Sequence, residues 1–150
     1  MSKFRPYKFW TRTQLGDHLK NLSFALNAGF GVRTLLEEAL TSEDWDPTMD
    51  YDGCTACQDM YHPSISCFLH DYLWRTGQGG KESDELFYLL MLKEGMLPRM
   101  AKRRWLAVRI AWLFYYKWYH FFKRRNVEPF SKAFMDALDQ LRLEYGRKGQ

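Results

Sequence analysis

The sequence predicts an all-α fold in a single domain. No stretch shows a sustained alternation of apolar and polar residues, which is the pattern of half-buried strands. Apolar residues instead recur at spacings of three and four in several segments, and proline or glycine stands at most ends of these segments. A chain of 150 residues has the length of one domain that forms a core of its own. We therefore treat residues 1–150 as one helical domain.

Two helices are expected before residue 41. The first, over residues 14–28, has one leucine face, and Gly29 ends it. A shorter helix follows over residues 32–40. Residues 41–62 lack helical periodicity and contain a proline, a glycine and five aspartates, all of which favour turns. We expect a long ordered or metal-bound loop there, and loops of this length are often functional.

Two further helices with a glycine-rich link are expected at the centre of the chain. The first begins at Pro63 and Ser64 and runs to about residue 76, where the sequence Gly-Gln-Gly-Gly ends it. The second begins within residues 81–83 and ends before Gly95. Because the link is so short, the two helices are predicted to form an antiparallel hairpin.

A long helix is expected from Pro98 to about Arg125, followed by a last helix that begins at Pro129. Nine of the eighteen residues 105–122 are aromatic, and residues 99–125 include nine bases and no acid. The loop at residues 41–62 has six acids and no lysine or arginine. This asymmetry suggests a cation near the loop and an anionic surface near the helix, although the two segments could also face each other or water.

The long aromatic and basic helix does not suit a membrane span, because its apolar part is only eighteen residues long and includes two cations. Its basic side chains fall on one narrow stripe: Lys102, Arg109, Lys117 and His120. The helix could be a core helix whose cations reach water along one edge. It could also lie on a phospholipid membrane surface, or pack against another protein such as a virion subunit. Nucleic acid is an improbable partner, since no recognised motif accompanies the bases.

The chemically distinctive residues gather in residues 54–71, which hold all three cysteines and two of the four histidines. Four side chains of the first hairpin helix are separated by steps of three and four and share one face: Cys67, His70, Asp71 and Trp74. Asp84 lies near the start of the second hairpin helix. It is predicted to be within side-chain reach of His70 if the helices pack at about 8–10 Å.

Two motifs stand out, Asp52-Gly53-Cys54-Thr55 and Cys67-Phe68-Leu69-His70-Asp71. Through them the chain resembles the phospholipase A2 superfamily, especially its bacterial and fungal branch. The hairpin is also similar to that of small phage-encoded proteins with a His-Asp-Tyr-Leu-Tyr-Arg pattern. In those proteins an Asp followed by a Phe returns on the second helix, and an Ala-Val-Arg sequence comes later, as Ala107-Val108-Arg109 does here. The resemblance covers roughly residues 50–115.

The resemblance implies a calcium-dependent ester hydrolase that acts on lipid. His70 would be the general base that activates a water molecule, and Asp84 would orient its imidazole. Asp71, together with Asp52 and Gly53 of the loop, would hold Ca²⁺. Such a cation takes oxygen ligands and would stabilise the oxyanion that forms from an ester carbonyl.

The chain also departs from the phospholipase pattern. The spacer between Cys54 and Cys67 is shorter than expected for the enzymes, although these cysteines occupy positions that are disulfide-bonded in secreted relatives. Leu73 stands where a glycine is usual. The alternative function is therefore a non-catalytic phage virion or assembly protein on the same scaffold.

A structural zinc site competes for the same residues. Cys54-x2-Cys57 and, nine residues later, Cys67-x2-His70 have the two-pair form of a tetrahedral zinc site. This interpretation makes His70 a metal ligand, whereas the hydrolase interpretation leaves Cys57 without a role. A third interpretation makes Cys67 and His70 ordinary core residues.

Residues 1–30 do not resemble a secretory signal, because Asp17, His18 and Lys20 interrupt any apolar run. We therefore expect synthesis and residence in a reducing compartment, the host cytoplasm for a phage protein, with association with a virion left open. In such a compartment three free thiols are easy to keep, and the sequence does not decide whether Cys54 and Cys67 are oxidised.

Overall fold

The structure, a computed structural model, describes residues 11–43, 45–47, 64–119 and 130–146. Within these ranges the only regular structure is helical, which confirms the predicted all-α class. The helices are α1 (Arg12–Ala25), α2 (Phe30–Thr41), α3 (Ile65–Arg75), α4 (Lys81–Lys93), α5 (Pro98–Tyr119) and α6 (Lys132–Leu141). A short π-helical segment, η2 (Arg142–Gly146), continues α6.

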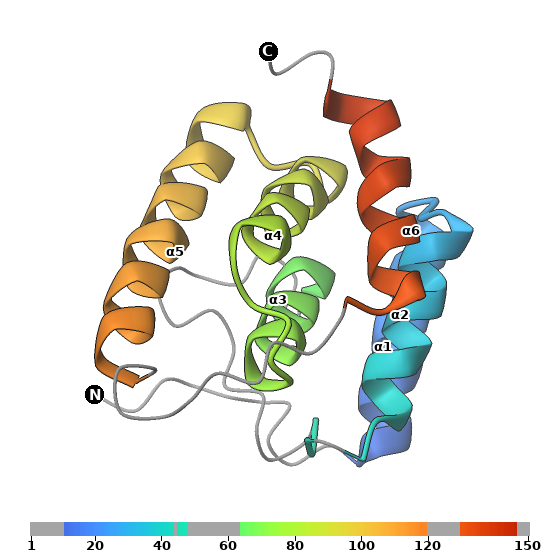
Figure 1. Cartoon of the computed structure of the whole chain (residues 1–150). Helices are drawn as coiled ribbons and strands as arrows, with labels where there is room; N and C mark the ends of the chain where they lie inside the picture. The colour runs from blue at the N-terminus through green and yellow to red at the C-terminus, as the bar shows by residue number, and fades with distance from the viewer. Residues whose placement is uncertain (1–10, 44, 48–63, 120–129, 147–150) are drawn as a thin grey trace.

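The helices form three layers (Figure 1). The consecutive helices α3 and α4 pack against each other in the middle, α5 covers one side of α4, and α1, α2 and α6 lie on the other side. In this last layer the backbones of α2 and α6 approach closely at Gly31, where a Cβ atom would lie 2.7 Å from the backbone nitrogen of Ala137. Glycine at this position therefore permits the α2–α6 contact.

One apolar core lies between the layers. Its largest fully enclosed side chains include Phe68 of α3, Phe87 of α4 and Phe134 of α6. Burying a side chain of this kind contributes about 1.5–3 kcal/mol to folding. Trp45 also joins the core, with its ring centroid 5.3 Å from that of Phe68, and its indole nitrogen donates a hydrogen bond to the backbone oxygen of Ala39. The core thus fixes α3 and α4 from both sides.

Local capping chemistry explains where the helices begin and end. The hydroxyl of Ser64 accepts a hydrogen bond from the backbone nitrogen of Cys67 and caps α3, so the helix begins at Ile65, just after the predicted start at Pro63 and Ser64. The link from α3 to α4 contains Gly77 and Gly80, whose φ angles of 84° and 143° disfavour other residues. Gly95 follows α4 with a φ of 92°. These positions determine the length of the link and hence which residues of α3 and α4 meet.

The last helix begins later than predicted. The sequence indicates Pro129 as its start, but α6 begins at Lys132. The hydroxyl of Ser131 accepts a hydrogen bond from the backbone nitrogen of Phe134 and acts as the N-cap. A side-chain acceptor for a free helical N–H outweighs the dihedral preference of proline here. The predicted end of α5 near residue 125 and most of the predicted loop at residues 41–62 lie outside the described residues.

Among the described residues, no helix combines the length and apolarity needed to cross a membrane. The long helix α5 spans 22 residues, but basic side chains recur along it. It packs on α4 through one face that includes the buried side chains of Ala101 and Val108. Its opposite face is exposed.

Candidate functional site

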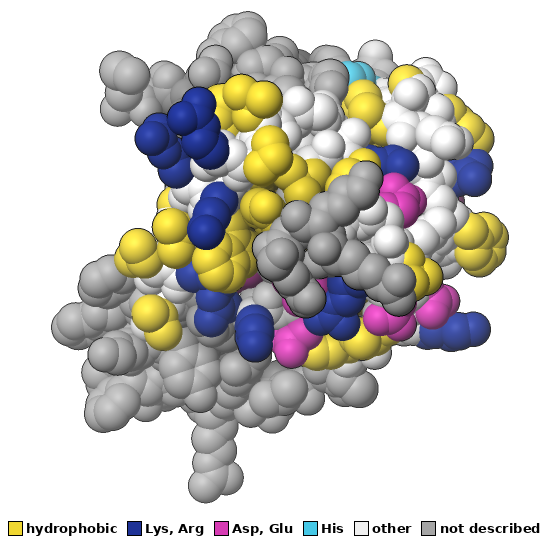
Figure 2. All heavy atoms as spheres, turned by 90° about the horizontal axis from the view of Figure 1, so that it is seen from above, with side chains coloured by type: hydrophobic (Ala, Val, Ile, Leu, Met, Phe, Trp, Pro, Cys, Tyr) yellow, Lys and Arg dark blue, Asp and Glu magenta, His cyan; other side chains and the backbone are white. Residues whose placement is uncertain are grey.

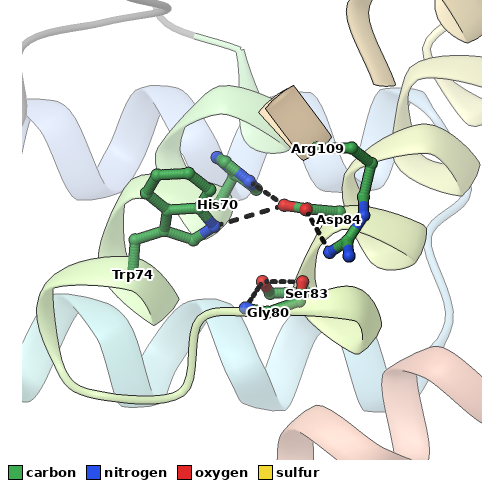
Figure 3. A network of polar contacts seen from close by, with 6 residues as sticks. All are labelled: His70, Trp74, Gly80, Ser83, Asp84 and Arg109. Atoms are coloured by element: carbon green, nitrogen blue, oxygen red, sulfur yellow. Dashed lines mark hydrogen bonds and ion pairs between the residues drawn. The ribbon is translucent and has the colours of Figure 1, made fainter. Parts of the chain in front are cut away.

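A completely buried carboxylate, Asp84, stands at the centre of the candidate site (Figure 3). Its Oδ1 atom lies 2.7 Å from Nε2 of His70 and accepts a hydrogen bond from the indole nitrogen of Trp74 at 3.2 Å. Its Oδ2 atom accepts from Nη1 of Arg109 at 2.9 Å. We call these four residues the Asp84 cluster. Three helices supply it: His70 and Trp74 come from α3, Asp84 from α4 and Arg109 from α5.

The local structure at the start of α4 positions Asp84. Ser83, which is also buried, accepts a hydrogen bond from the backbone nitrogen of Gly80 and donates one to the Gly80 carbonyl, both at 2.9 Å. Figure 3 shows this cap directly beside the carboxylate. Asp84 therefore lies in the first turn of α4, where the free N–H groups of the helix favour a negative charge.

The ring of His70 is held between two aromatic side chains. Its centroid lies 4.8 Å from that of Trp74 and 4.7 Å from that of Phe87. Its side chain is 12% exposed. Because an ionised carboxylate only accepts hydrogen bonds, Nε2 of His70 must be the protonated nitrogen in this contact. The lone pair of the neutral imidazole is then on Nδ1, which is the atom that could take a proton from a substrate or a water molecule.

The charges in the cluster are balanced. The guanidinium of Arg109 offsets the buried carboxylate of Asp84, and an unpaired charge at this depth would be strongly destabilising. The predicted proximity of Asp84 to His70 is confirmed by the contact between them. The sequence does not assign Arg109 to the site: it groups this residue on one narrow stripe with Lys102, Lys117 and His120, and the structure turns its side chain towards Asp84. One feature of the sequence could have indicated this pair: Asp84 is an acid on an otherwise apolar face of α4, and the following helix, α5, is rich in bases.

The predicted calcium ligands are described only in part. Asp71 lies on α3 and accepts a hydrogen bond from Nε of Arg75 at 2.9 Å. Asp52 and Gly53 lie outside the described residues. Within the described ranges, no three or more side chains of His, Cys, Asp or Glu are grouped so that they could hold a metal ion. The structure therefore describes His70 and Asp71, whereas the loop residues of the predicted calcium site lie outside the described ranges.

The cysteines are likewise described only in part. Cys67, at the start of α3, is buried and disulfide-bonded. The other two cysteines of the chain, Cys54 and Cys57, lie outside the described residues. The sequence leaves the redox state of Cys67 undecided, and the structure has this residue in a disulfide. The number and spacing of cysteines in the sequence do not determine which sulfur atoms lie close together in the fold. While it is oxidised, Cys67 has no thiolate to give to the predicted zinc site, which it would share with His70.

No protein-family model, curated protein or solved structure shows significant similarity to this chain. The resemblance to phospholipases A2 thus rests on the two sequence motifs, and the function has to be argued from the geometry of the Asp84 cluster. That cluster contains the minimum of a general-base site: an imidazole, a carboxylate that orients it, and groups that hold the carboxylate.

Proposed function

We propose that this chain is a calcium-dependent ester hydrolase of the phospholipase A2 type and that it acts on a lipid ester. In this proposal the chain is phage-encoded, like the small phage proteins that its hairpin resembles. The observation that supports this proposal is the 2.7 Å contact between Nε2 of His70 and Oδ1 of Asp84. It joins two consecutive helices at the positions that a phospholipase-like hairpin requires. In this proposal α3 and α4 are the two helices of that hairpin.

In the proposed reaction His70 is the general base. Its Nδ1 atom takes a proton from a water molecule, and the water oxygen forms a bond to the ester carbonyl carbon. The imidazolium that results is stabilised by the adjacent carboxylate of Asp84 and returns the proton to the alcohol when the ester bond breaks. Trp74 and Phe87 hold the ring plane during both transfers. General-base catalysis of this type contributes about 10²–10⁴-fold to the rate.

Arg109 and Trp74 are positioning residues in this proposal. Trp74 and His70 contact Oδ1 of Asp84, and Arg109 contacts Oδ2, so hydrogen bonds to both oxygens hold the carboxylate in one orientation. The positive charge of Arg109 offsets the charge of the Asp84 carboxylate, which accepts hydrogen bonds and does not take the proton itself. Asp84 therefore orients the imidazole and stabilises its charged form.

The proposed calcium site includes Asp71, with Asp52 and Gly53 of the loop. Asp71 fits this role by its position, because it lies one residue after His70 on α3 and carries a carboxylate, the kind of oxygen ligand that Ca²⁺ prefers. A bound Ca²⁺ would supply polarisation of the ester carbonyl and stabilisation of the oxyanion.

Calcium should raise the melting temperature of the parent protein. A ligand that binds only the native state at 100 times its Kd adds about 2.7 kcal/mol, which is on the order of 5–10 °C for a domain of this size. Asp71→Asn should remove most of the shift, whereas Asp136→Asn, on an exposed position of α6, should retain it. The measurement is thermal unfolding with Ca²⁺ and with EGTA. A tightly held equivalent of zinc with no calcium shift would contradict the proposal and favour the set Cys54, Cys57, Cys67 and His70.

The proposed partner is an anionic phospholipid surface that contacts the exposed face of α5. Leu106, Ile110 and Leu113 follow one another at steps of four and three, and their exposed fractions are 46%, 54% and 55%. Arg99 and Arg103 are exposed beside them. Figure 2 shows basic and hydrophobic side chains next to each other on the side of the molecule where α5 lies. An apolar stripe flanked by cations and without acids is typical of helices that lie at lipid headgroups.

Binding to vesicles should depend on this stripe. We expect the parent to bind phosphatidylglycerol vesicles more tightly than phosphatidylcholine vesicles, and salt to weaken the binding. The double variant Leu106→Asp with Ile110→Asp should lower the affinity at least about tenfold, because two apolar side chains lose their burial in lipid. Leu143→Asp is the matched control, since Leu143 is exposed on η2 and far from the stripe in sequence. Equal co-sedimentation of the double variant and the parent would contradict the lipid partner.

The second candidate function is a non-catalytic virion or assembly protein. The burial of the cluster favours it, since Asp84 is completely enclosed and the side chain of His70 is only 12% exposed. In this case the cluster would fix the packing of α3, α4 and α5, and the exposed face of α5 would contact another virion protein. The loss of His70 would then reduce stability and no catalytic activity would exist.

A further inference from the structure

A pocket between α4 and α5 is separate from the Asp84 cluster. Its volume is about 250 Å³, and its lining residues are Lys81, Glu85 and Tyr88 of α4 with Lys102 and Trp105 of α5. The three residues of α4 are separated by steps of four and three, so they form one stripe of that helix, and the two residues of α5 form the facing stripe. None of the five belongs to the Asp84 cluster.

The charge in the pocket is positive. Glu85, its only acidic lining residue, is bound by two nitrogens of Arg142, with Nε to Oε2 at 2.5 Å and Nη2 to Oε1 at 2.8 Å. The hydrogen bonds that Arg142 donates to Glu85 raise the pKa of the Arg142 guanidinium, and the two opposite charges offset each other. Within the described ranges Lys81 and Lys102 make no ion pair with a carboxylate. Two ammonium groups are thus available to an anion.

The remaining walls are aromatic. Tyr88 and Trp105 present large apolar surfaces, and their polar atoms can remain in contact with water. A pocket with a few charged groups and aromatic walls suits a ligand that combines a charge with an apolar body. Two lysines match a phosphate monoester in particular, because it has about −1.5 to −2 charges near neutral pH and lysine binds it as a point charge.

We propose that this pocket binds an organic phosphate, with the phosphate between Lys81 and Lys102 and the apolar part against Tyr88 and Trp105. Two sources share this chemistry: a small free organic phosphate and the headgroup of an anionic phospholipid. The position of Lys102 is compatible with a lipid headgroup. Lys102 lines the pocket and lies one turn of α5 before Leu106 of the exposed apolar stripe. The proposal does not depend on hydrolysis.

Calorimetric titration with 1-naphthyl phosphate, in EGTA and at moderate salt, tests the proposal. The parent should bind this probe at least about tenfold more tightly than inorganic phosphate or 1-naphthol, because each of these lacks one half of the match. Lys81→Gln and Lys102→Gln should each weaken binding about tenfold. Lys132→Gln, which removes an exposed lysine at the start of α6, should leave it unchanged. All three substitutions are at exposed positions, and circular dichroism verifies that the variants fold.

A second titration separates the two sources. Monomeric dihexanoyl phosphatidate should bind more tightly than 1-naphthyl phosphate if the natural ligand is a lipid headgroup, and no more tightly if it is a small organic phosphate. Either result supports an organic-phosphate site. The proposal would be overturned if the titration of every phosphate probe failed to reach saturation. It would also be overturned if both lysine variants bound the probe with the affinity of the parent. The same titrations on His70→Ala keep this result distinct from the proposed hydrolase, since this variant should bind the probes like the parent.

Discussion

Replacing Asp84 with alanine should lower the free energy of unfolding by about 3–5 kcal/mol, the range measured when one partner of a buried ion pair is removed. The substitution leaves the guanidinium of Arg109 without its counter-charge and the ring nitrogens of His70 and Trp74 without their acceptor. It also leaves a cavity at a completely enclosed position. Urea denaturation of the parent and the variant measures the difference.

Glu82→Ala is the matched control for this prediction. Glu82 is also an acid in the first turn of α4, but it is only partly buried. Its removal should change the stability by no more than about 1 kcal/mol. Asp84→Asn should fall between the two, because an amide can still accept hydrogen bonds but does not balance Arg109. A loss of less than about 1 kcal/mol for Asp84→Ala would show that the cluster is not the structural centre of the α3, α4 and α5 interface.

Replacing His70 with alanine should reduce ester hydrolysis by about 10²–10⁴-fold, the contribution of a positioned general base. The variant removes the imidazole that contacts Asp84 and leaves the aromatic side chains of Trp74 and Phe87 in place. The turnover number at saturating lipid should fall, while the affinity for vesicles should change little because His70 lies on α3 and its side chain is only 12% exposed, so it is not part of the exposed stripe of α5.

His18→Ala provides the control for the loss of a histidine. His18 lies on α1, in the layer that faces away from α5, so this variant should keep the turnover of the parent. His70→Gln, which retains a polar side chain of similar size, should be as inactive as the alanine variant. Turnover in His70→Gln that matches the parent would assign the chemistry to another residue.

The sequence predicted the parts of this fold that depend on local chemistry. The Ser64 cap and the glycines between α3 and α4 determine helix ends through single-residue preferences, and they lie where the sequence indicates. The contact of His70 with Asp84 was predictable too, because it follows from the helical period and the length of the link. At Pro129 two local preferences competed, and the hydroxyl of Ser131 determined the start of α6.

The sequence did not predict the contacts that depend on tertiary packing. Arg109 reaches Asp84 because of the way α5 crosses α4, and neither the period nor the composition of α5 determines that crossing. The wheel grouped Arg109 with other cations and did not show its contact with Asp84, because a helical wheel includes no neighbouring helix. The disulfide of Cys67 is another contact that spacing alone leaves undecided. Half of the candidate site was therefore predictable, and the half that holds the carboxylate was not.

The central proposal, that His70 performs calcium-dependent ester hydrolysis, is tested most directly by the release of fatty acid from phospholipid vesicles. The parent should release fatty acid from phosphatidylglycerol vesicles when Ca²⁺ is present, and EGTA should stop the release. Phosphatidylcholine vesicles in the same assay ensure that a weak surface interaction does not hide activity. Absence of calcium-dependent release from both kinds of vesicle would contradict the hydrolase and leave the Asp84 cluster as a structural element.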